Sequence, residues 1–210
     1  MEEFISTIGE KRNIEKIEST AAAEKKTVVT ASGSPTVTMI FSVLCIIFWA
    51  FNMGWIGEGG RFAIGVVQIA VFAGYIIGSA FMLKTGDSFG GNVNMICATF
   101  FGGIGGFTNV VSSITGEQIY NFKIFGIAFT MLGLMLIILA PLLKRESVMS
   151  CVIFLTGGFS TTMMGLMSIG FFAGTPMGTI AAWSLLVCGG CGFASVIMEM
   201  AGYLDPADDK

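Results

Sequence analysis

The sequence predicts an all-α membrane protein with six transmembrane helices. Three observations predict this class. Of the 210 residues, 54% are hydrophobic. Only 12% are charged, whereas soluble domains have about 25%. The 14 acidic and 11 basic residues lie almost entirely outside six long apolar segments. Among the common classes of protein, the helical membrane proteins are the class that shows all three features.

The chain opens with a polar stretch of mixed charge, residues 1–31, which we expect to be a cytoplasmic tail. Residues 1–26 lack the apolar core of a secretion signal, so we expect no cleavable leader. Pro35 follows a Ser-Gly-Ser run and is placed in the first turn of a helix, where proline is favoured.

Six apolar segments then follow, each close to the length of about 20 residues that spans a bilayer. We place them near 36–56, 62–83, 89–111, 121–143, 147–171 and 176–204. They predict one channel or transporter domain over residues 32–204, followed by a short acidic tail at 205–210.

The basic residues predict the orientation of these spans. Nine of the 11 Lys and Arg residues lie in the two tails and in the loops 83–89 and 143–147. Only Arg61 and Lys123 lie on the other side. Because basic loops stay in the cytoplasm, both termini are predicted to be cytoplasmic.

Six spans that start inside divide into two halves of opposite orientation, which suggests a 3+3 inverted repeat. Glycine-rich patches at 102–106 and 188–192 occupy corresponding places in the third and sixth spans.

Composition also excludes several functions. The chain has no histidine, which removes histidine-based relays, metal sites and hydrolytic triads. Its net charge of −3 and lack of a basic cluster argue against nucleic-acid binding. All five cysteines lie in apolar spans, and we interpret them as packing residues. We expect no cofactor, no metal and no enzymatic activity.

The polar groups within the spans are almost all neutral, which favours a small solute that crosses uncharged or weakly held. Gln68 and Asn94 are candidate pore residues, because a buried amide has several hydrogen bonds to satisfy. Thr99 and Thr156 are weaker candidates, since such hydroxyls commonly bond to their own helix. Phe41, Phe100 and Phe101 are packing residues by default, and aromatic side chains also form dry gates.

Glu199 is the one acid predicted within a span, near its end. It is either a solvated residue at the cytoplasmic interface or a vestibule group that handles protons.

With these residues in view, the chain resembles the acetate uptake transporter family, the SatP/YaaH type of acetate–succinate permeases. The sixth span carries the best match, and its matching residues are Trp183, Cys188, Gly189 and Glu199. In the third span, Gly86-Asp87-Ser88-Phe89-Gly90 is followed at the family's offset by residues 97–101. In the second span, Gly65 and Gln68 match.

The first span departs from the family motif. Pro35 and Phe41 are retained, whereas Ser32 stands where the family has an entrance asparagine. The resemblance places a gate at Phe41, at Cys97 in place of a family tyrosine, and at a leucine of the fifth span, for which Leu155 is the candidate.

The resemblance implies a six-helix protomer with its own pore, assembled as a homo-hexamer in the cell inner (plasma) membrane. It implies passage of acetate, with succinate and similar small carboxylates as further candidates, by an anion channel or by proton symport. The alternatives are a channel for a small neutral solute such as urea, and a membrane scaffold that transports nothing.

Overall fold

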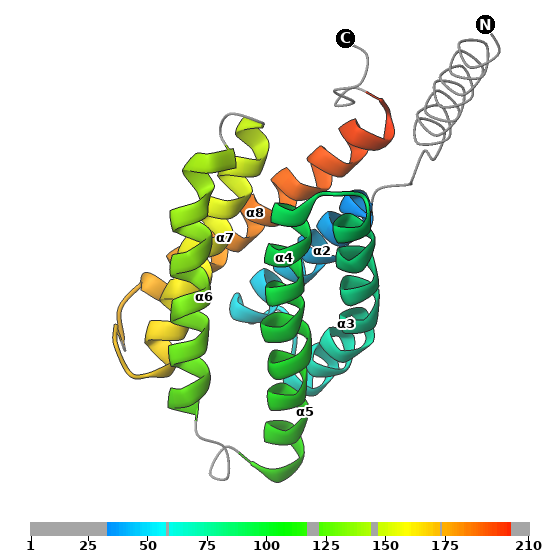
Figure 1. Ribbon diagram of the computed structural model, residues 1–210. Helices are drawn as coiled ribbons and strands as arrows, with labels where there is room; N and C mark the ends of the chain where they lie inside the picture. Colours follow the sequence, from blue (N-terminus) through cyan, green and yellow to red (C-terminus); the bar gives the residue numbers. More distant parts are fainter. Residues whose placement is uncertain (1–32, 58, 117–121, 144–146, 173, 203–210) are drawn as a thin grey trace, which may run out of the picture. The chain divides into compact units, whose positions relative to one another are not determined.

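The computed structural model describes residues 33–57, 59–116, 122–143, 147–172 and 174–202 (Figure 1). The predicted tails, 1–31 and 205–210, and the predicted entrance residue Ser32 lie outside the described residues. The division into two tails and one domain therefore stays a prediction. The fold below is that of the unit that begins at Ser32.

Six helical segments of the described chain are long and apolar enough to cross a membrane, and the described residues contain no strand. The predicted fold class is confirmed. The spans are α2 (Ser34–Asn52), α3 (Gly60–Lys84), a third span that joins α4 (Ser88–Cys97), the π-helix η1 (Ala98–Ile104) and α5 (Gly105–Thr115), then α6 (Phe122–Leu143), α7 (Val148–Ser168) and α8 (Met177–Met200). The third span runs to Thr115 rather than 111, and the sixth ends at Met200 rather than 204.

Local sequence explains several helix ends. Pro35 lies in the first turn of α2, as predicted. Asp87 caps α4, because its side chain accepts a hydrogen bond of 2.7 Å from the Gly90 amide. Ser147 caps α7 in the same way, with 3.3 Å to the Ser150 amide. Gly86 has φ of 95°, a conformation that favours glycine, and it allows the tight turn between α3 and α4.

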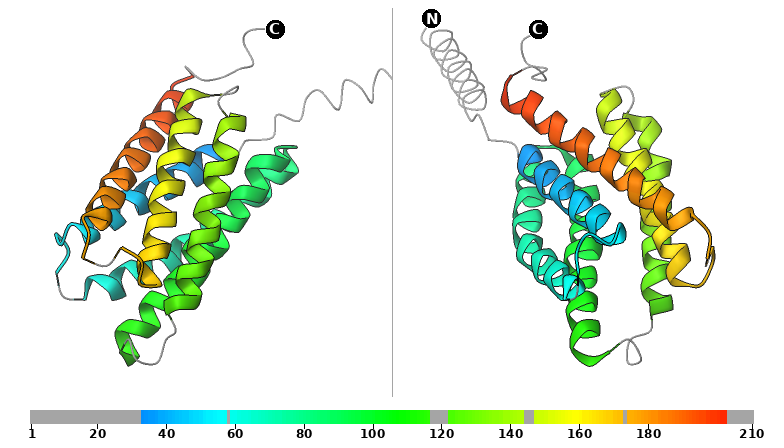
Figure 2. Two further views of the ribbon diagram at one scale, coloured as in Figure 1. Left: turned by 90° about the vertical axis from the view of Figure 1, so that its left-hand side faces the viewer. Right: turned by 180° about the vertical axis from the view of Figure 1, so that it is seen from behind.

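The helices enclose an interior. Helix α2 packs between α3 and α8, and α7 packs between α6 and α8 (Figure 2). Helix α3 packs along the whole third span, whereas α6 approaches that span chiefly at η1. Helix α2 begins and α8 ends at the same end of the bundle (Figure 1), as an even number of spans requires. Which side of the membrane this end faces stays a prediction.

Glycines allow the backbones of neighbouring helices to approach closely, as they commonly do in membrane bundles. A Cβ atom on Gly158 of α7 would lie 2.8 Å from the carbonyl oxygen of Gly133 in α6. A Cβ on Gly189 of α8 would lie 2.8 Å from the Ser42 carbonyl oxygen in α2. One on Gly106 would lie 3.0 Å from the Ile69 amide nitrogen in α3. At these three positions the absence of a side chain sets how closely the helices around the interior can pack.

The two glycine-rich patches pack against helices that are not equivalent in a 3+3 repeat. Gly102 and Gly106 face α3, the second span, whereas Gly189 and Gly192 face α2, the first span. The inverted repeat stays a prediction.

Replacing Gly158 by alanine should destabilise the protein by about 1–3 kcal/mol, because the added methyl group meets backbone atoms of α6 that cannot rotate away. Gly190→Ala is the matched control, since a Cβ there has no neighbour within 4 Å. Thermal unfolding in detergent measures both variants. Equal stability of the two would contradict the close α6–α7 contact.

Candidate functional site

Three cavities follow one another through the interior of the helix bundle and share lining residues. We call them the polar cavity, of about 140 Å³, the apolar neck, of about 40 Å³, and the amide-lined cavity, of about 350 Å³. Phe41 lines the polar cavity and the neck. Phe48, Phe129 and Met164 line both the neck and the amide-lined cavity. The three spaces therefore form a continuous series that narrows in the middle.

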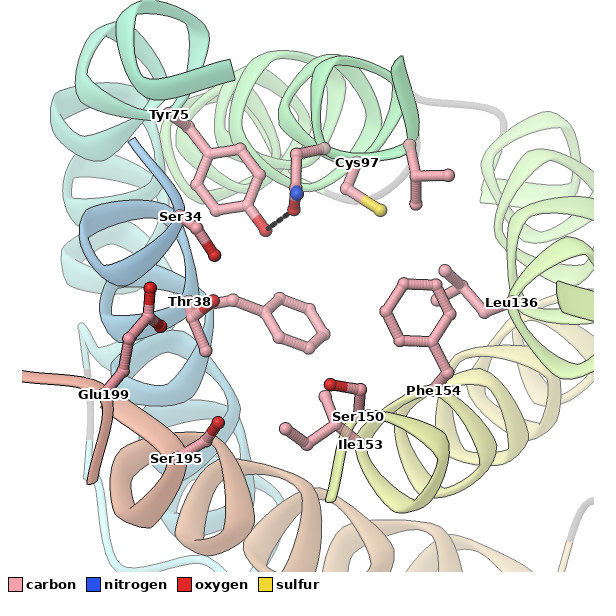
Figure 3. A pocket seen from close by; sticks show the side chains of 13 residues that line it. Ser34, Thr38, Tyr75, Cys97, Leu136, Ser150, Ile153, Phe154, Ser195 and Glu199 are labelled. Carbon is pink, nitrogen blue, oxygen red and sulfur yellow. Dashed lines mark hydrogen bonds between the residues drawn. The ribbon is translucent and has the colours of Figure 1, made fainter. Parts of the chain in front are cut away.

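The polar cavity lies near the end of the bundle where α2 begins and α8 ends. Figure 3 shows Thr38 of α2 and Ser195 and Glu199 of α8 on one side of it, and Leu136 of α6 and Phe154 of α7 on the other. Ser150 of α7 adds a hydroxyl beside Phe154, so the lining mixes polar and hydrocarbon groups within one small space.

A hydrogen-bonded pair closes a third side of the polar cavity. The Tyr75 hydroxyl donates to Asn94 Oδ1 at 3.4 Å (Figure 3). Asn94 Nδ2 donates in turn to the Gly90 carbonyl oxygen at 2.9 Å, which orients the amide. Cys97 lines the cavity beside this pair. The phenol oxygen retains a lone pair that can accept a further hydrogen bond.

The apolar neck is closed by phenylalanines. The ring centroids of Phe41 and Phe101 lie 5.8 Å apart, and those of Phe101 and Phe129 lie 5.4 Å apart with nearly perpendicular planes. The one hydroxyl in the lining belongs to Thr161, and it donates to the Gly157 carbonyl oxygen of its own helix at 2.8 Å. A volume near that of one water molecule, about 30 Å³, with no polar group to hold it, makes a dry barrier to ions.

The amide-lined cavity on the far side of the neck contains Gln68, whose side chain is only 1% exposed. Gln68 Nε2 donates to the carbonyl oxygen of Phe101, which lies in η1. Gln68 Oε1 accepts from Asn109 Nδ2 at 2.7 Å. A π-helix departs from regular α-helical hydrogen bonding, and Gln68 supplies one of its carbonyls with a donor from another helix. Gln68 thereby positions a phenylalanine of the neck.

The structure brings four of the predicted site residues together and separates others. Phe41, Asn94, Cys97 and Glu199 all line the polar cavity. Gln68 lies in the amide-lined cavity, beyond the neck.

Three other predicted residues lie away from all three cavities. Thr99 is exposed, donates to the Met95 carbonyl oxygen at 3.0 Å, and lines an apolar groove between the third span and α6. Phe100 is half-buried and packs against the core around Cys97. Pro35 is half-buried in the first turn of α2.

The predicted gate leucine, Leu155, does not face the interior. It is 42% exposed and lines none of the cavities, because one residue along a helix turns the side chain by about 100°. Its neighbours Ile153 and Phe154 occupy the cavity wall instead. Thr156 makes the ordinary bond of a helical threonine, donating to the Val152 carbonyl oxygen at 2.7 Å.

Sequence reasoning missed Tyr75 and Phe129 as lining residues, whereas Phe101, weighed from sequence as a packing residue or part of a gate, lines the neck. The resemblance expects a tyrosine on the third span where this chain has Cys97; here Tyr75 of α3 brings a hydroxyl into the same cavity. Helical spacing from Phe41 would have found Thr38 and Phe48. No local signal separates Phe129 from the rest of the 19 phenylalanines.

The cysteines lie where their predicted packing role places them. All five are free, and Cys45, Cys97 and Cys188 are buried. The thiol of Cys45 lies 3.8 Å from that of Cys188, which donates to the Ile153 carbonyl oxygen at 3.4 Å. These contacts join α2, α7 and α8 next to the neck, which Cys45 lines.

Replacing Gln68 by leucine should lower stability by about 1–3 kcal/mol, because it leaves the Phe101 carbonyl and the Asn109 amide without their partner. Asn92→Leu is the control, since Asn92 is an exposed amide that bonds only to its own helix. Thermal unfolding in detergent gives both values. If Gln68→Leu melts like the control, Gln68 does not hold η1.

Comparisons with known proteins bear on the fold. No family model matches the sequence, and no curated protein matches it. The solved structure of the bacterial acetate channel SatP is similar with a TM-score of 0.67 over 82% of this chain and 93% of that chain, at 15% sequence identity. At that identity the likeness shows the fold. The chain is a multi-pass membrane protein with the fold of an acetate channel.

Proposed function

We propose that this chain conducts small monocarboxylates, with acetate as the first candidate, across the plasma membrane through a pathway inside each protomer. The observation that carries the proposal is the series of cavities, in which a polar cavity meets a dry, uncharged neck between phenylalanines. The channel-like fold supports the same conclusion.

The neck favours the neutral acid over its anion. Taking an isolated carboxylate out of water is costly, and the neck presents no hydrogen-bond donor to replace the lost hydration. A weak acid escapes this cost when it is protonated. The proposal is therefore that acetate crosses with a proton rather than as a free anion.

Glu199 is the candidate for handling that proton. It is half-buried and lines the polar cavity, at the end of the pathway where the predicted cytoplasmic side lies. A carboxyl group beside an incoming carboxylate favours a shared proton, because two negative charges at close range repel. The solvated role considered for Glu199 from sequence is the alternative.

The alternative to this proposal is a channel for a small neutral solute such as urea. Assembly as a homo-oligomer, a hexamer by the family resemblance, belongs to this proposal, as does succinate as a further substrate. The anion-channel mode is the alternative to proton coupling.

Uptake of labelled acetate into liposomes that contain the purified protein should rise steeply as pH falls from 8 to 5 at constant membrane potential. The reason is that the neutral acid is the minor species throughout this range and grows up to about tenfold per pH unit. Glu199→Gln should flatten this dependence. Uptake that is flat with pH, or that follows voltage alone, would replace proton coupling by an anion channel. Urea flux without acetate flux would favour the neutral-solute channel.

Shortening Phe101 to leucine should widen the neck and weaken the preference for the neutral acid, so that acetate uptake becomes less sensitive to pH and chloride begins to leak. Phe107→Leu is the control, because Phe107 is 56% exposed on α5 and lines no part of the neck. Chloride efflux from the same liposomes measures the leak. Equal chloride fluxes in the two variants would show that Phe101 does not close the pathway.

A further inference from the structure

An apolar groove lies on the outside of the bundle between the third span and α6. We call it the lateral groove, and it measures about 560 Å³. It forms because α6 approaches the third span chiefly at η1 and makes little contact with α5. Its walls are open to the outside, since Ile104, Phe107 and Ile124 are between 41% and 68% exposed. In a bilayer this groove therefore faces either lipid or another protein.

One buried hydroxyl in the lateral groove has no partner within the protein. The buried threonines of the described chain are Thr108, Thr161 and Thr162. Thr161 and Thr162 each donate to a carbonyl oxygen of their own helix at 2.8 Å, as helical threonines commonly do. Thr108 lines the groove and is only 2% exposed, and among the described residues its hydroxyl has no hydrogen-bond partner. Because an unpaired buried hydroxyl is costly, we expect an acceptor from outside the chain.

The depth of Thr108 in the bilayer indicates what that acceptor is. The third span has 28 residues, or about 42 Å of helix at 1.5 Å per residue. The hydrocarbon core is about 30 Å thick, so a centred span extends about 6 Å beyond it at each end. Thr108 lies about 10 Å before the end of the span at Thr115. It therefore lies about 4 Å inside the core boundary, close to the ester groups of the lipids.

A positive charge lies at the same end of the groove. Lys123 is exposed in the first turn of α6, directly before Ile124 in the groove wall. Helix α5 ends and α6 begins at one end of the bundle (Figure 1). A lysine ammonium group attracts phosphate as a point charge, and basic residues at a membrane surface attract anionic lipids.

A phospholipid presents the groups that this arrangement needs, in the same order. Its phosphate matches Lys123, its ester oxygen matches Thr108, and its acyl chain matches the apolar walls. A transmembrane helix of another protein matches less well, because its backbone carbonyls are already bonded within that helix. Charge and hydrogen bonding therefore favour lipid over a second copy of the chain.

We propose that the lateral groove is a binding site for one phospholipid, with an acyl chain between the third span and α6, an ester oxygen accepting from the Thr108 hydroxyl, and the phosphate at Lys123. The site lies outside the series of cavities and does not depend on what the chain transports.

The first test titrates the full chain, purified in detergent, with palmitoyl-oleoyl phosphatidylglycerol and measures the first bound lipid by native mass spectrometry. Thr108→Val removes the hydroxyl at nearly constant shape and should weaken binding about fivefold, the effect of one neutral hydrogen bond. Thr99→Val is the matched control. Thr99 lines the same groove, but its hydroxyl donates to the Met95 carbonyl oxygen at 3.0 Å. The control should bind lipid like the wild type.

The second test fills the groove. A Cβ on Gly103 would lie 3.5 Å from the Phe72 ring, an ordinary contact, so Gly103→Leu places a side chain in the groove. It should weaken lipid binding at least about tenfold. Gly190→Leu is the control, since a Cβ there has no neighbour within 4 Å and Gly190 lines no part of the groove. If Gly103→Leu fails to fold, Ala128→Leu fills the same groove from α6.

The third test compares phosphatidylglycerol with diacylglycerol, which keeps the acyl chains and esters but lacks the phosphate. Lys123→Gln should weaken binding of phosphatidylglycerol about fivefold and leave binding of diacylglycerol unchanged. Lys84→Gln is the control, because it removes the same charge at the other end of the bundle, where α3 ends (Figure 1). Equal losses for both lipids would overturn the placement of the phosphate.

The outcomes separate this site from general contact with lipid. If the wild type, Thr108→Val and Gly103→Leu bind lipid equally, or if the wild type binds none, the site is overturned. A change in oligomer size of Gly103→Leu with unchanged lipid binding also overturns it, because the groove is then covered by a second copy of the chain. None of these measurements uses transport, so the proposed function stands or fails separately.

Discussion

The hydrogen bond from Gln68 to the Phe101 carbonyl is the interaction on which the interior depends. It ties α3 to η1, the π-helical segment of the third span, and Asn109 fixes the Gln68 side chain in place. Phe101 in turn contacts Phe41 of α2 and Phe129 of α6. Because α6 approaches the third span chiefly at η1, this level closes the bundle. A polar contact buried in a membrane protein thereby sets the position of an apolar barrier.

The apolar neck and the polar cavity are adjacent but differ in the groups that line them. The neck is unfavourable for a charged solute and recognises no particular molecule, because its lining offers neither a free hydrogen-bond donor nor a free acceptor. The polar cavity sets hydroxyl groups and Glu199 beside hydrocarbon within a small space. Phe41 borders both. A single side chain therefore joins the polar cavity to the apolar neck.

The residues that were carried over by resemblance lie in different environments in the structure. Phe41 and Cys97 line the polar cavity, each at the position that the resemblance gave it. Leu155 does not, since an alignment without a firm motif leaves the phase of α7 open by one residue, or about 100°. Tyr75 lines the same cavity as Cys97, but it belongs to a different helix. A position-by-position alignment with the family would not show this.

The sequence by itself determined the class, the six spans and the uncharged character of the interior. Placing an unpaired backbone group or a charge in lipid costs so much free energy that membrane-spanning segments must be helical and nearly free of charged residues. This pattern is visible in the sequence itself. Only the tertiary structure decided which side chains meet. The pairing of Phe41 with Phe101, the bond from Gln68 to η1, and the hydroxyls of Thr38 and Ser195 in one cavity all join different helices. Such contacts depend on the rotation of each helix about its axis and on how closely two helices approach each other at glycine. Apolar spans of similar hydropathy do not encode either property locally.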